Sequence, residues 1–280
     1  MSELLFVNWN VNPEIFRIGG FALRWYSLLF VAGFVLGYYL FLKFLHREGV
    51  REKMLDPLLY TVLAATIIGA RLGHCCFYDP GYYFGSWSGF WEIFQPWKGG
   101  LASHGGAIGI LLALWWYSKR YGRKYDIDFV WILDRICITV AFAGFFIRLG
   151  NLFNSEIYGD PTNLPWGFIF ERNGETLPKH PTQLYEALAY LTLGLVMLAL
   201  YKFRLPKLYK GTLFGIFLLG CFGFRFAIEF IKEPQVGFEQ TMTLDMGQWL
   251  SVPFILTGIA VLIISFVKKA PAIAQTGKKN

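Results

Sequence analysis

Residues able to bind or activate a substrate stand at the ends of long apolar runs. His104 lies in the segment Gly99-Gly-Leu-Ala-Ser-His-Gly-Gly106, directly before a pair of glycines. Histidine can exchange a proton near neutral pH, and glycine lets a lipid or a backbone approach closely. The segment therefore predicts either a proton-transfer site or a buried structural histidine beside helix-packing glycines.

A second polar group follows another apolar run, in Arg148-Leu-Gly-Asn-Leu-Phe-Asn-Ser-Glu156 and the nearby Gly159. Arg148 and Asn151 are three residues apart and so share one face of a helix. Asn154 and Glu156 extend this patch where the helix is expected to leave the membrane.

Two further polar groups stand at other run ends. Arg225 and Glu229 are four residues apart, a spacing that predicts a pair in which the carboxylate holds the guanidinium. The segment His180-Pro-Thr-Gln-Leu-Tyr-Glu186 begins another run and is a weaker polar cluster.

Arginine dominates the charge of these groups. The cationic side chains are Arg24, Arg71, Arg148 and Arg225, and the acidic ones are Glu156, Glu186 and Glu229. The guanidinium fork suits phosphate and keeps its charge when it is partly desolvated. A phosphate at headgroup depth, as in a phospholipid, is the ligand that this set indicates. The alternative is that each arginine extends to the nearest membrane interface.

The elements that position these residues are apolar segments, most of them close to the roughly 20 residues that cross a bilayer. The sequence predicts an all-α polytopic membrane protein, folded as one integral membrane domain over residues 1–280. Its seven transmembrane helices are expected at about 21–45, 57–78, 101–118, 129–147, 182–201, 212–231 and 246–267.

Basic residues predict how these spans are oriented. Four segments hold four Lys or Arg each: Lys43–Lys53, Lys119–Lys124, Lys202–Lys210 and the tail from Lys268. With seven spans all four lie on one side, which the positive-inside rule makes the cytoplasm. The N-terminus is then outside, and residues 148–181 form a small periplasmic head.

This orientation brings the polar residues of all seven spans to the outer half of the membrane. Asp134 and Arg135, near the inner face, are the exception. The aromatic-rich segment Asp79–Gly100 is expected to lie on the outer membrane surface.

Composition excludes several classes of protein. Of the 280 residues, 55% are hydrophobic and 16% charged, and the mean hydropathy is +0.43, which argues against a soluble enzyme and against disorder. The four cysteines form no metal or disulfide pattern. The net charge of +7 is spread over membrane-flanking segments, so no nucleic acid partner is expected. No metal or nucleotide motif is present, so we expect no cofactor.

Taken together, these motifs make the sequence resemble the bacterial prolipoprotein diacylglyceryl transferases over nearly its whole length. The matching segments, in order, are Leu23-Arg-Trp-Tyr26, the His104-Gly-Gly loop, Arg148-Leu-Gly-Asn151, the segment from His180 to Glu186, Arg225 with Glu229, and Met246-Gly-Gln248. The sequence departs from the family pattern at Ile147, Ser155 and Cys221, where Gly, Gly and Tyr are usual.

The resemblance implies an inner-membrane enzyme whose active site faces the periplasm. It would transfer the diacylglyceryl group of phosphatidylglycerol to the lipobox cysteine of a preprolipoprotein signal peptide, forming a thioether and releasing glycerol-1-phosphate. The implied catalytic residues are His104, Tyr26 and Arg225. The implied phosphatidylglycerol-binding residues are Arg148, Asn151, Gly105, Asn154, Glu156, Gly159 and Glu229.

Other functions remain as alternatives. An anion or lipid transporter with an outer-leaflet binding site would need polar residues through the full membrane depth, whereas four spans are apolar in their inner halves. An intramembrane protease is disfavoured because Ser86-Trp-Ser-Gly89 lacks a leading glycine and lies in a loop. A seven-helix receptor would not require the histidine and arginine clusters.

Overall fold

The computed structural model describes residues 6–100, 102–233 and 244–273, except for the side chains of Phe21, Ser103 and His104. This part of the chain is mostly helical, as expected. Six of its helices are long and apolar enough to cross a membrane: Trp25–Glu48, Glu52–Phe77, Phe129–Phe153, Thr182–Lys207, Thr212–Ile231 and Met246–Lys268. Its fold is that of a polytopic helical membrane protein.

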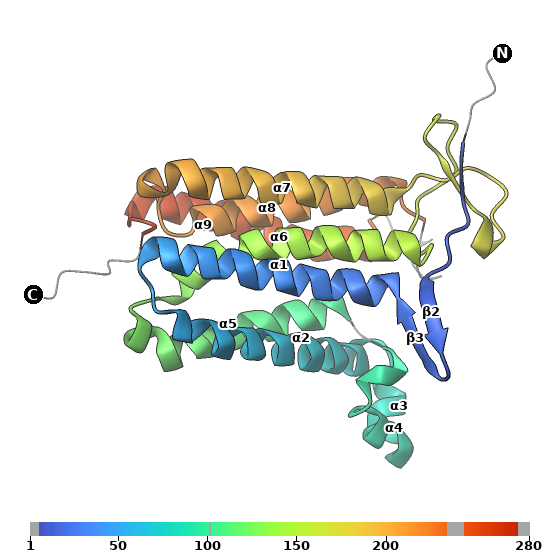
Figure 1. Ribbon diagram of the computed structural model, residues 1–280, viewed down its shortest axis with the longest axis horizontal. Coiled ribbons are helices and arrows are strands. Elements are labelled where there is room, and N and C mark those ends of the chain that lie inside the picture. Colours follow the sequence, from blue (N-terminus) through green and yellow to red (C-terminus); the bar gives the residue numbers. More distant parts are fainter. Residues whose placement is uncertain (1–5, 101, 234–243, 274–280) are drawn as a thin grey trace, which may run out of the picture. The chain divides into compact units, whose positions relative to one another are not determined.

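Long helices occupy all of the predicted spans (Figure 1). They are α1 (Trp25–Glu48), α2 (Leu55–Phe77), α5 (Ser103–Tyr125), α6 (Phe129–Phe153), α7 (Thr182–Arg204), α8 (Thr212–Ile228) and α9 (Met246–Lys268). The short elements are β1 (Val7–Trp9), β2 (Glu14–Ile18), β3 (Phe21–Arg24), η1 (Glu52–Met54), α3 (Pro80–Gly85), α4 (Trp87–Glu92), η2 (Pro96–Lys98), β4 (Phe168–Phe170), η3 (Glu171–Asn173), η4 (Leu205–Lys207) and η5 (Glu229–Ile231).

The helix α5 differs from the others in polarity. It has 23 residues but is not one of the six candidate spans among the described residues. Ser103 and His104 occupy its first turn and basic residues fill its last turns, which shortens the apolar stretch between them. A count of seven spans therefore stays a prediction.

The chain divides into two compact units. Unit 1 comprises Met1–Phe41 and Asp134–Ile273, and unit 2 comprises Leu42–Leu133 and Ala274–Asn280. The single integral membrane domain expected over residues 1–280 stays a prediction.

In unit 2, α2 and α5 pack through glycines. A Cβ on Gly105 would lie 2.6 Å from the Cα of Gly73, and a Cβ on Gly109 would lie 3.1 Å from the Cα of Gly69. Glycines four residues apart on each helix thus let the two backbones touch, as in other membrane helix pairs. This contact fixes the start of α5 against α2.

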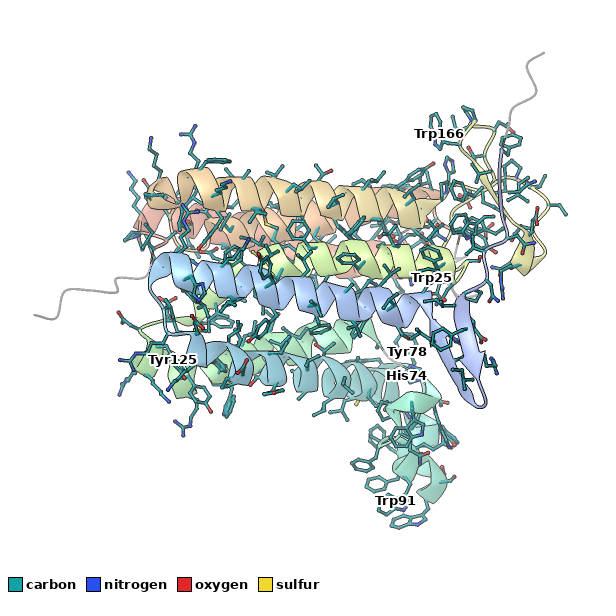
Figure 2. The ribbon with its side chains drawn as sticks, in the orientation of Figure 1. Trp25, His74, Tyr78, Trp91, Tyr125 and Trp166 are labelled. Atoms are coloured by element: carbon teal, nitrogen blue, oxygen red, sulfur yellow. The ribbon has the colours of Figure 1, made fainter. Side chains whose placement is uncertain are left out.

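The aromatic segment of unit 2 forms a distinct element, which we call the aromatic arm (residues 78–98). It contains α3, α4 and η2, and Figure 2 labels Tyr78 and Trp91 on it. Its exposed large side chains are Tyr78, Tyr82, Phe84, Trp87, Phe90, Trp91, Phe94 and Trp97. Rings of this kind gather at membrane–water interfaces, and an interfacial position of the arm stays a prediction.

In unit 1, the polar pair Asp134–Arg135 is fully buried. The Asp134 carboxylate accepts the backbone N–H of Gly211 at 2.7 Å and of Phe214 at 2.9 Å, at the start of α8. Arg135 donates to the carbonyl of Ala272, beyond the end of α9, at 2.6 Å. These two side chains therefore fasten α6 to the start of α8 and to the segment after α9.

Between α6 and α7 the chain of unit 1 forms loops with β4 and η3, which we call the head, and its periplasmic location stays a prediction. Helix α6 continues to Phe153, so residues 148–153 are helical and the loop begins at residue 154. Strand β4 pairs in parallel with β1, with Val7 opposite Phe168. Lys179 pairs with Glu233 and, at 3.3 Å, with Glu175, so the head is also held to the segment after α8.

Candidate active site

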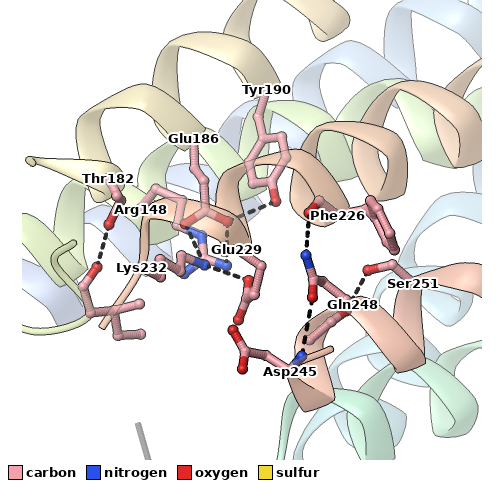
Figure 3. Close-up of polar contacts among 12 residues, drawn as sticks. Arg148, Thr182, Glu186, Tyr190, Phe226, Glu229, Lys232, Asp245, Gln248 and Ser251 are labelled. Atoms are coloured by element: carbon pink, nitrogen blue, oxygen red, sulfur yellow. Dashed lines mark hydrogen bonds and ion pairs between the residues drawn. The ribbon is translucent and has the colours of Figure 1, made fainter. Parts of the chain in front are cut away.

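Charged side chains from α6, α7 and the end of α8 form a buried ionic cluster in unit 1 (Figure 3). Arg148 Nη2 lies 3.1 Å from Glu186 Oε1, and Lys232 Nζ lies 3.2 Å from both Glu186 Oε2 and Glu229 Oε2. We call Arg148, Glu186, Glu229 and Lys232 the ionic cluster. It lies where the sequence places the outer ends of three spans.

Burial makes the charges of the ionic cluster depend on one another. The Glu186 side chain is fully buried, and that of Lys232 is 2% exposed. Desolvation lowers the pKa of Lys232, while the carboxylates of Glu186 and Glu229 oppose this by favouring the ammonium form. Removing one member of a buried ion pair typically costs about 3–5 kcal/mol, so the cluster is a fixed arrangement that orients Arg148.

The start of α9 closes one side of the ionic cluster. A Cβ on Gly247 would collide with the Glu229 carboxylate, so only glycine fits there. Gln248 donates to the carbonyl of Phe226 at 3.3 Å and accepts the N–H of Asp245 at 3.1 Å (Figure 3). The Met246-Gly-Gln248 motif thus ties α9 to the end of α8 and to Glu229.

A second polar set, which we call the amide group, comprises Asn151, Asn154, Glu156 and Gln183. Glu156 Oε1 accepts from Asn151 Nδ2 at 2.6 Å and from Asn154 Nδ2 at 3.2 Å, and the Glu156 carbonyl accepts from Gln183 Nε2 at 2.7 Å. Asn151 Oδ1 and Gln183 Oε1 are buried without a donor among the described residues. These two oxygen atoms could therefore accept hydrogen bonds from a ligand that carries hydroxyl or amide donors.

The backbone on both sides of Glu156 is strained. Ser155 has φ of 55° and Ile157 has φ of 61°, in the left-handed region that side chains other than glycine rarely adopt. Glycine adopts this conformation without such strain, so the position of Ser155 favours glycine. The hydroxyl of Ser155 is also buried without a partner among the described residues.

Tyr26, at the start of α1, lies against α6 in the same unit. A Cβ on Gly150 would lie 2.7 Å from Tyr26 Cδ2, so the ring packs directly on the glycine between Arg148 and Asn151. The charges of Glu156 and Arg148 both act on the Tyr26 hydroxyl. The structure thus brings Tyr26 to the ionic cluster and the amide group.

Arg225 lies in α8, half-buried and one turn before Glu229. Glu229 pairs with Lys232 in the described part of the chain, and the expected pairing of Arg225 with Glu229 stays a prediction. The turn η5 brings Lys232 back towards the carboxylate three residues earlier. Arg225 lies close enough to act electrostatically on Lys232, so it is near the ionic cluster.

The glycines proposed to bind phospholipid are enclosed by the protein itself. The Gly159 N–H donates to the His180 carbonyl at 2.9 Å, and a Cβ on Gly159 would lie 2.7 Å from Thr182 Cγ2. Gly105 lies in the contact between α2 and α5. Close packing accounts for both glycines, and their binding of phospholipid stays a prediction.

The sequence indicated two residues of unit 2, His104 and Arg71, and of these the structure describes the side chain of Arg71 only. His104 stands in the first turn of α5, but its side chain lies outside the described residues, so its role stays a prediction. Arg71 is 4% exposed and donates to four backbone carbonyls. Its guanidinium is therefore hydrogen-bonded within the protein and is not available to bind a phosphate.

Lys232 of the ionic cluster was not predicted from the sequence, and Gln183 was predicted only as part of the weaker polar cluster from His180 to Glu186. Lys232 directly follows a span, where lysine is common at the interface, and its spacing of three residues from Glu229 was the available signal. Gln183, one residue into α7, is fully buried, a fact that only the fold reveals.

Comparison with known proteins identifies similar sequences over almost the entire chain. The family model described as prolipoprotein diacylglyceryl transferase matches residues 13–264. A phosphatidylglycerol--prolipoprotein diacylglyceryl transferase of Bacteroides fragilis is 44% identical over 279 residues, covering 95% of this chain and 98% of the relative. Proteins of the same name from Tolumonas auensis and Chloroherpeton thalassium are 44% and 42% identical, covering 94% and 96% of this chain and 98% of each relative.

Proposed function

Because this chain belongs to the prolipoprotein diacylglyceryl transferase family, we infer that it transfers the diacylglyceryl group of phosphatidylglycerol to the cysteine of a prolipoprotein. It is a multi-pass membrane transferase of lipoprotein biosynthesis, and its helices provide the membrane-embedded body that a lipid substrate requires.

The reaction needs a thiolate, a leaving phosphate and a place for the thiol proton. The cysteine sulfur attacks the glyceryl carbon that bears the phosphate ester, a C–S bond forms, and the C–O bond breaks. Glycerol-1-phosphate leaves with the electron pair of that bond. A free thiol has a pKa of about 8.5, so a base or a cationic field must promote its ionisation.

The observation that carries the proposed binding site is the pair of unsatisfied acceptors beside Arg148. Asn151 stands one helical turn after Arg148, and its Oδ1, like Gln183 Oε1, has no donor among the described residues. The phosphatidylglycerol headgroup carries hydroxyl donors next to a phosphate. We assign the phosphate to Arg148 and the hydroxyls to Asn151 and Gln183.

We assign the remaining roles from chemistry and from the family resemblance. Tyr26 and Arg225 stabilise the charge that develops on the leaving phosphate, and His104 accepts the thiol proton. Glu229 orients the cationic groups, and Glu156 with Asn154 holds Asn151. Gly105 and Gly159, which pack against the protein itself, are assigned to phosphatidylglycerol binding from the family resemblance alone.

The location follows from the distribution of basic residues. Seven spans, with the N-terminus outside and the tail inside, place the ionic cluster at the periplasmic side of the inner membrane. The protein substrate is then a preprolipoprotein whose signal peptide presents a lipobox cysteine at that side.

A headgroup comparison tests the site. Purified enzyme is given a lipobox peptide with phosphatidylglycerol or with phosphatidylpropanol, which keeps the phosphate but lacks the headgroup hydroxyls. Wild type should prefer phosphatidylglycerol, and Gln183→Met and Asn151→Leu should reduce that preference by about 3- to 10-fold, the value of a lost hydrogen bond. Thr192→Val, farther along α7, is the control and should keep the preference.

Different results would reject the hydroxyl-binding site and the transferase function. Unchanged preference in both variants would reject the hydroxyl site. Absence of thioether product from the wild-type enzyme would reject the transferase function and favour the alternative of an anion or lipid transporter.

A further inference from the structure

Arg71, in the last turns of α2, is a buried cation held by carbonyl oxygens. Its Nε donates to Ile93 O at 3.1 Å, and its Nη1 donates to Gly99 O at 2.6 Å and to Gly100 O at 3.2 Å. Its Nη2 donates to Glu92 O. The planar guanidinium with its five N–H groups can donate to several carbonyls at once. A single ammonium group cannot reproduce this arrangement.

These acceptors belong to two separate segments of unit 2. The carbonyls of Glu92 and Ile93 lie at the end of α4, in the aromatic arm, and the Arg71 guanidinium also lies 5.0 Å from the ring centroid of Tyr83. The carbonyls of Gly99 and Gly100 form the turn that leads towards α5. One side chain therefore joins the aromatic arm to the turn before His104.

The turn at Gly99 and Gly100 has little freedom. Their φ values of 92° and 71° favour glycine, and a Cβ on Gly100 would lie 2.6 Å from the His74 ring and 2.8 Å from Arg71 Nη1. The Ala102 N–H then donates to the Ala70 carbonyl at 2.9 Å, and α5 begins at the next residue. Gly100 and Ala102 are thus both held by contacts with the last turns of α2.

We propose that Arg71 is a positioning residue for the transfer reaction. It acts through the Gly99–Gly100 turn and sets the place of the first turn of α5, where His104 stands. This role rests on the proposed function. It differs from phosphate binding, because the guanidinium donors are used by carbonyls.

The proposal predicts a loss of turnover rather than of lipid affinity. Misplacement of a reacting group by about 1 Å can cost on the order of 100-fold in rate. Arg71→Met should therefore lower kcat by about 10- to 100-fold and leave KM for phosphatidylglycerol within about twofold. Arg71→Lys should recover part of kcat, since an ammonium group can still reach some of the carbonyls.

Arg135→Met is the matched control. Arg135 is also buried, also donates to a carbonyl, and lies near a tyrosine ring, that of Tyr201, but it belongs to unit 1 and the proposed site does not include it. Both variants should unfold at a lower temperature than wild type. Only Arg71→Met should lose kcat when both are assayed below their unfolding temperatures.

A double-mutant cycle with Gly100→Ala tests whether Arg71 acts through the turn. Alanine at this position disturbs the same turn from the other side, so Arg71→Met/Gly100→Ala should lose no more kcat than the worse single variant. Independent roles would multiply the two losses.

Three results would overturn the positioning role: wild-type kcat in Arg71→Met, an equal loss of kcat in Arg135→Met, or multiplied losses in the double variant. An inactive wild-type enzyme would instead overturn the proposed function, so the two failures are told apart in one assay.

Discussion

At the scale of single residues, backbone strain surrounds the acidic member of the amide group. Glu156 is flanked by Ser155 and Ile157, both in the left-handed region. Strained backbone of this kind persists where the surrounding structure enforces it, and it often accompanies function. Between these two residues, the carboxylate of Glu156 accepts from Asn151 and its carbonyl accepts from Gln183.

Ser155→Gly should stabilise the protein. The left-handed conformation costs a non-glycine residue about 1–2 kcal/mol, and the greater flexibility of unfolded glycine offsets about 0.5–1 kcal/mol of that gain. We expect a higher unfolding temperature in detergent, with Ser118→Gly, inside α5, as a control that lowers it. An unfolding temperature for Ser155→Gly at or below that of wild type would contradict the account.

Arg148→Lys should lose most activity although it keeps the charge. Lysine cannot hold Glu186 and a phosphate with one planar fork. Arg24→Lys is the control, because Arg24 is exposed and only 3.6 Å from Glu14 in a surface pair. Comparable turnover by purified Arg148→Lys and Arg24→Lys would reject the headgroup role of Arg148.

His104→Gln should lower the chemical rate by about 10²- to 10⁴-fold while lipid binding survives, because a positioned base contributes that much. The measurement is the pH–rate profile of the purified variant at saturating phosphatidylglycerol. If the wild-type profile and most of the rate remain, His104 is a structural residue and another group accepts the proton.

At the scale of the elements, the contact between α2 and α5 allows a test of whether Gly105 serves helix packing or lipid binding. Gly105→Ala should destabilise the protein by about 1–3 kcal/mol, the usual cost of overpacking, because its Cβ would meet the backbone of Gly73. In Gly106→Ala the nearest atom lies at 3.6 Å, an ordinary contact. Equal unfolding temperatures for the two variants would contradict this, and a selective rise in the Gly105→Ala KM would support lipid binding.

The sequence predicted the long helices well because a membrane span must be apolar over most of its length. It also pointed to Arg148 and Glu186, since a charge inside a span needs a partner or a ligand. Pairings between distant segments were not predictable. Strands β1 and β4 have three residues each, and no local pattern links them.

The arginines show where residue type alone misleads. Arg71 and Arg148 both lie near the end of a predicted span, and both suit a phosphate. The four acceptors of Arg71 come from residues far along the chain. Arg148 instead pairs with a carboxylate, and the nearby Asn151 Oδ1 has no donor among the described residues. Only the folded structure distinguishes a guanidinium that is bonded to backbone carbonyls from one that is placed to bind a phosphate.

At the scale of the whole molecule, the orientation in the membrane depends on whether α5 crosses it. A reporter fused after Lys98 should be periplasmic, and reporters after Lys124 and after Val267 should be cytoplasmic. Reporters after Lys98 and Lys124 on the same side would mean that α5 does not span. A periplasmic reporter after Val267 would overturn the whole orientation.

The attachment of the C-terminal segment bears on how the protein is made. Arg135 donates to the carbonyl of Ala272, the Ala272 N–H donates to Leu208 O at 3.0 Å, and Ala270 O accepts the N–H of Lys210 at 2.8 Å. The ribosome delivers Arg135 to the membrane long before it has synthesised these acceptors. Unit 1 therefore completes this part of its packing only after α9 and the residues that follow it have been synthesised.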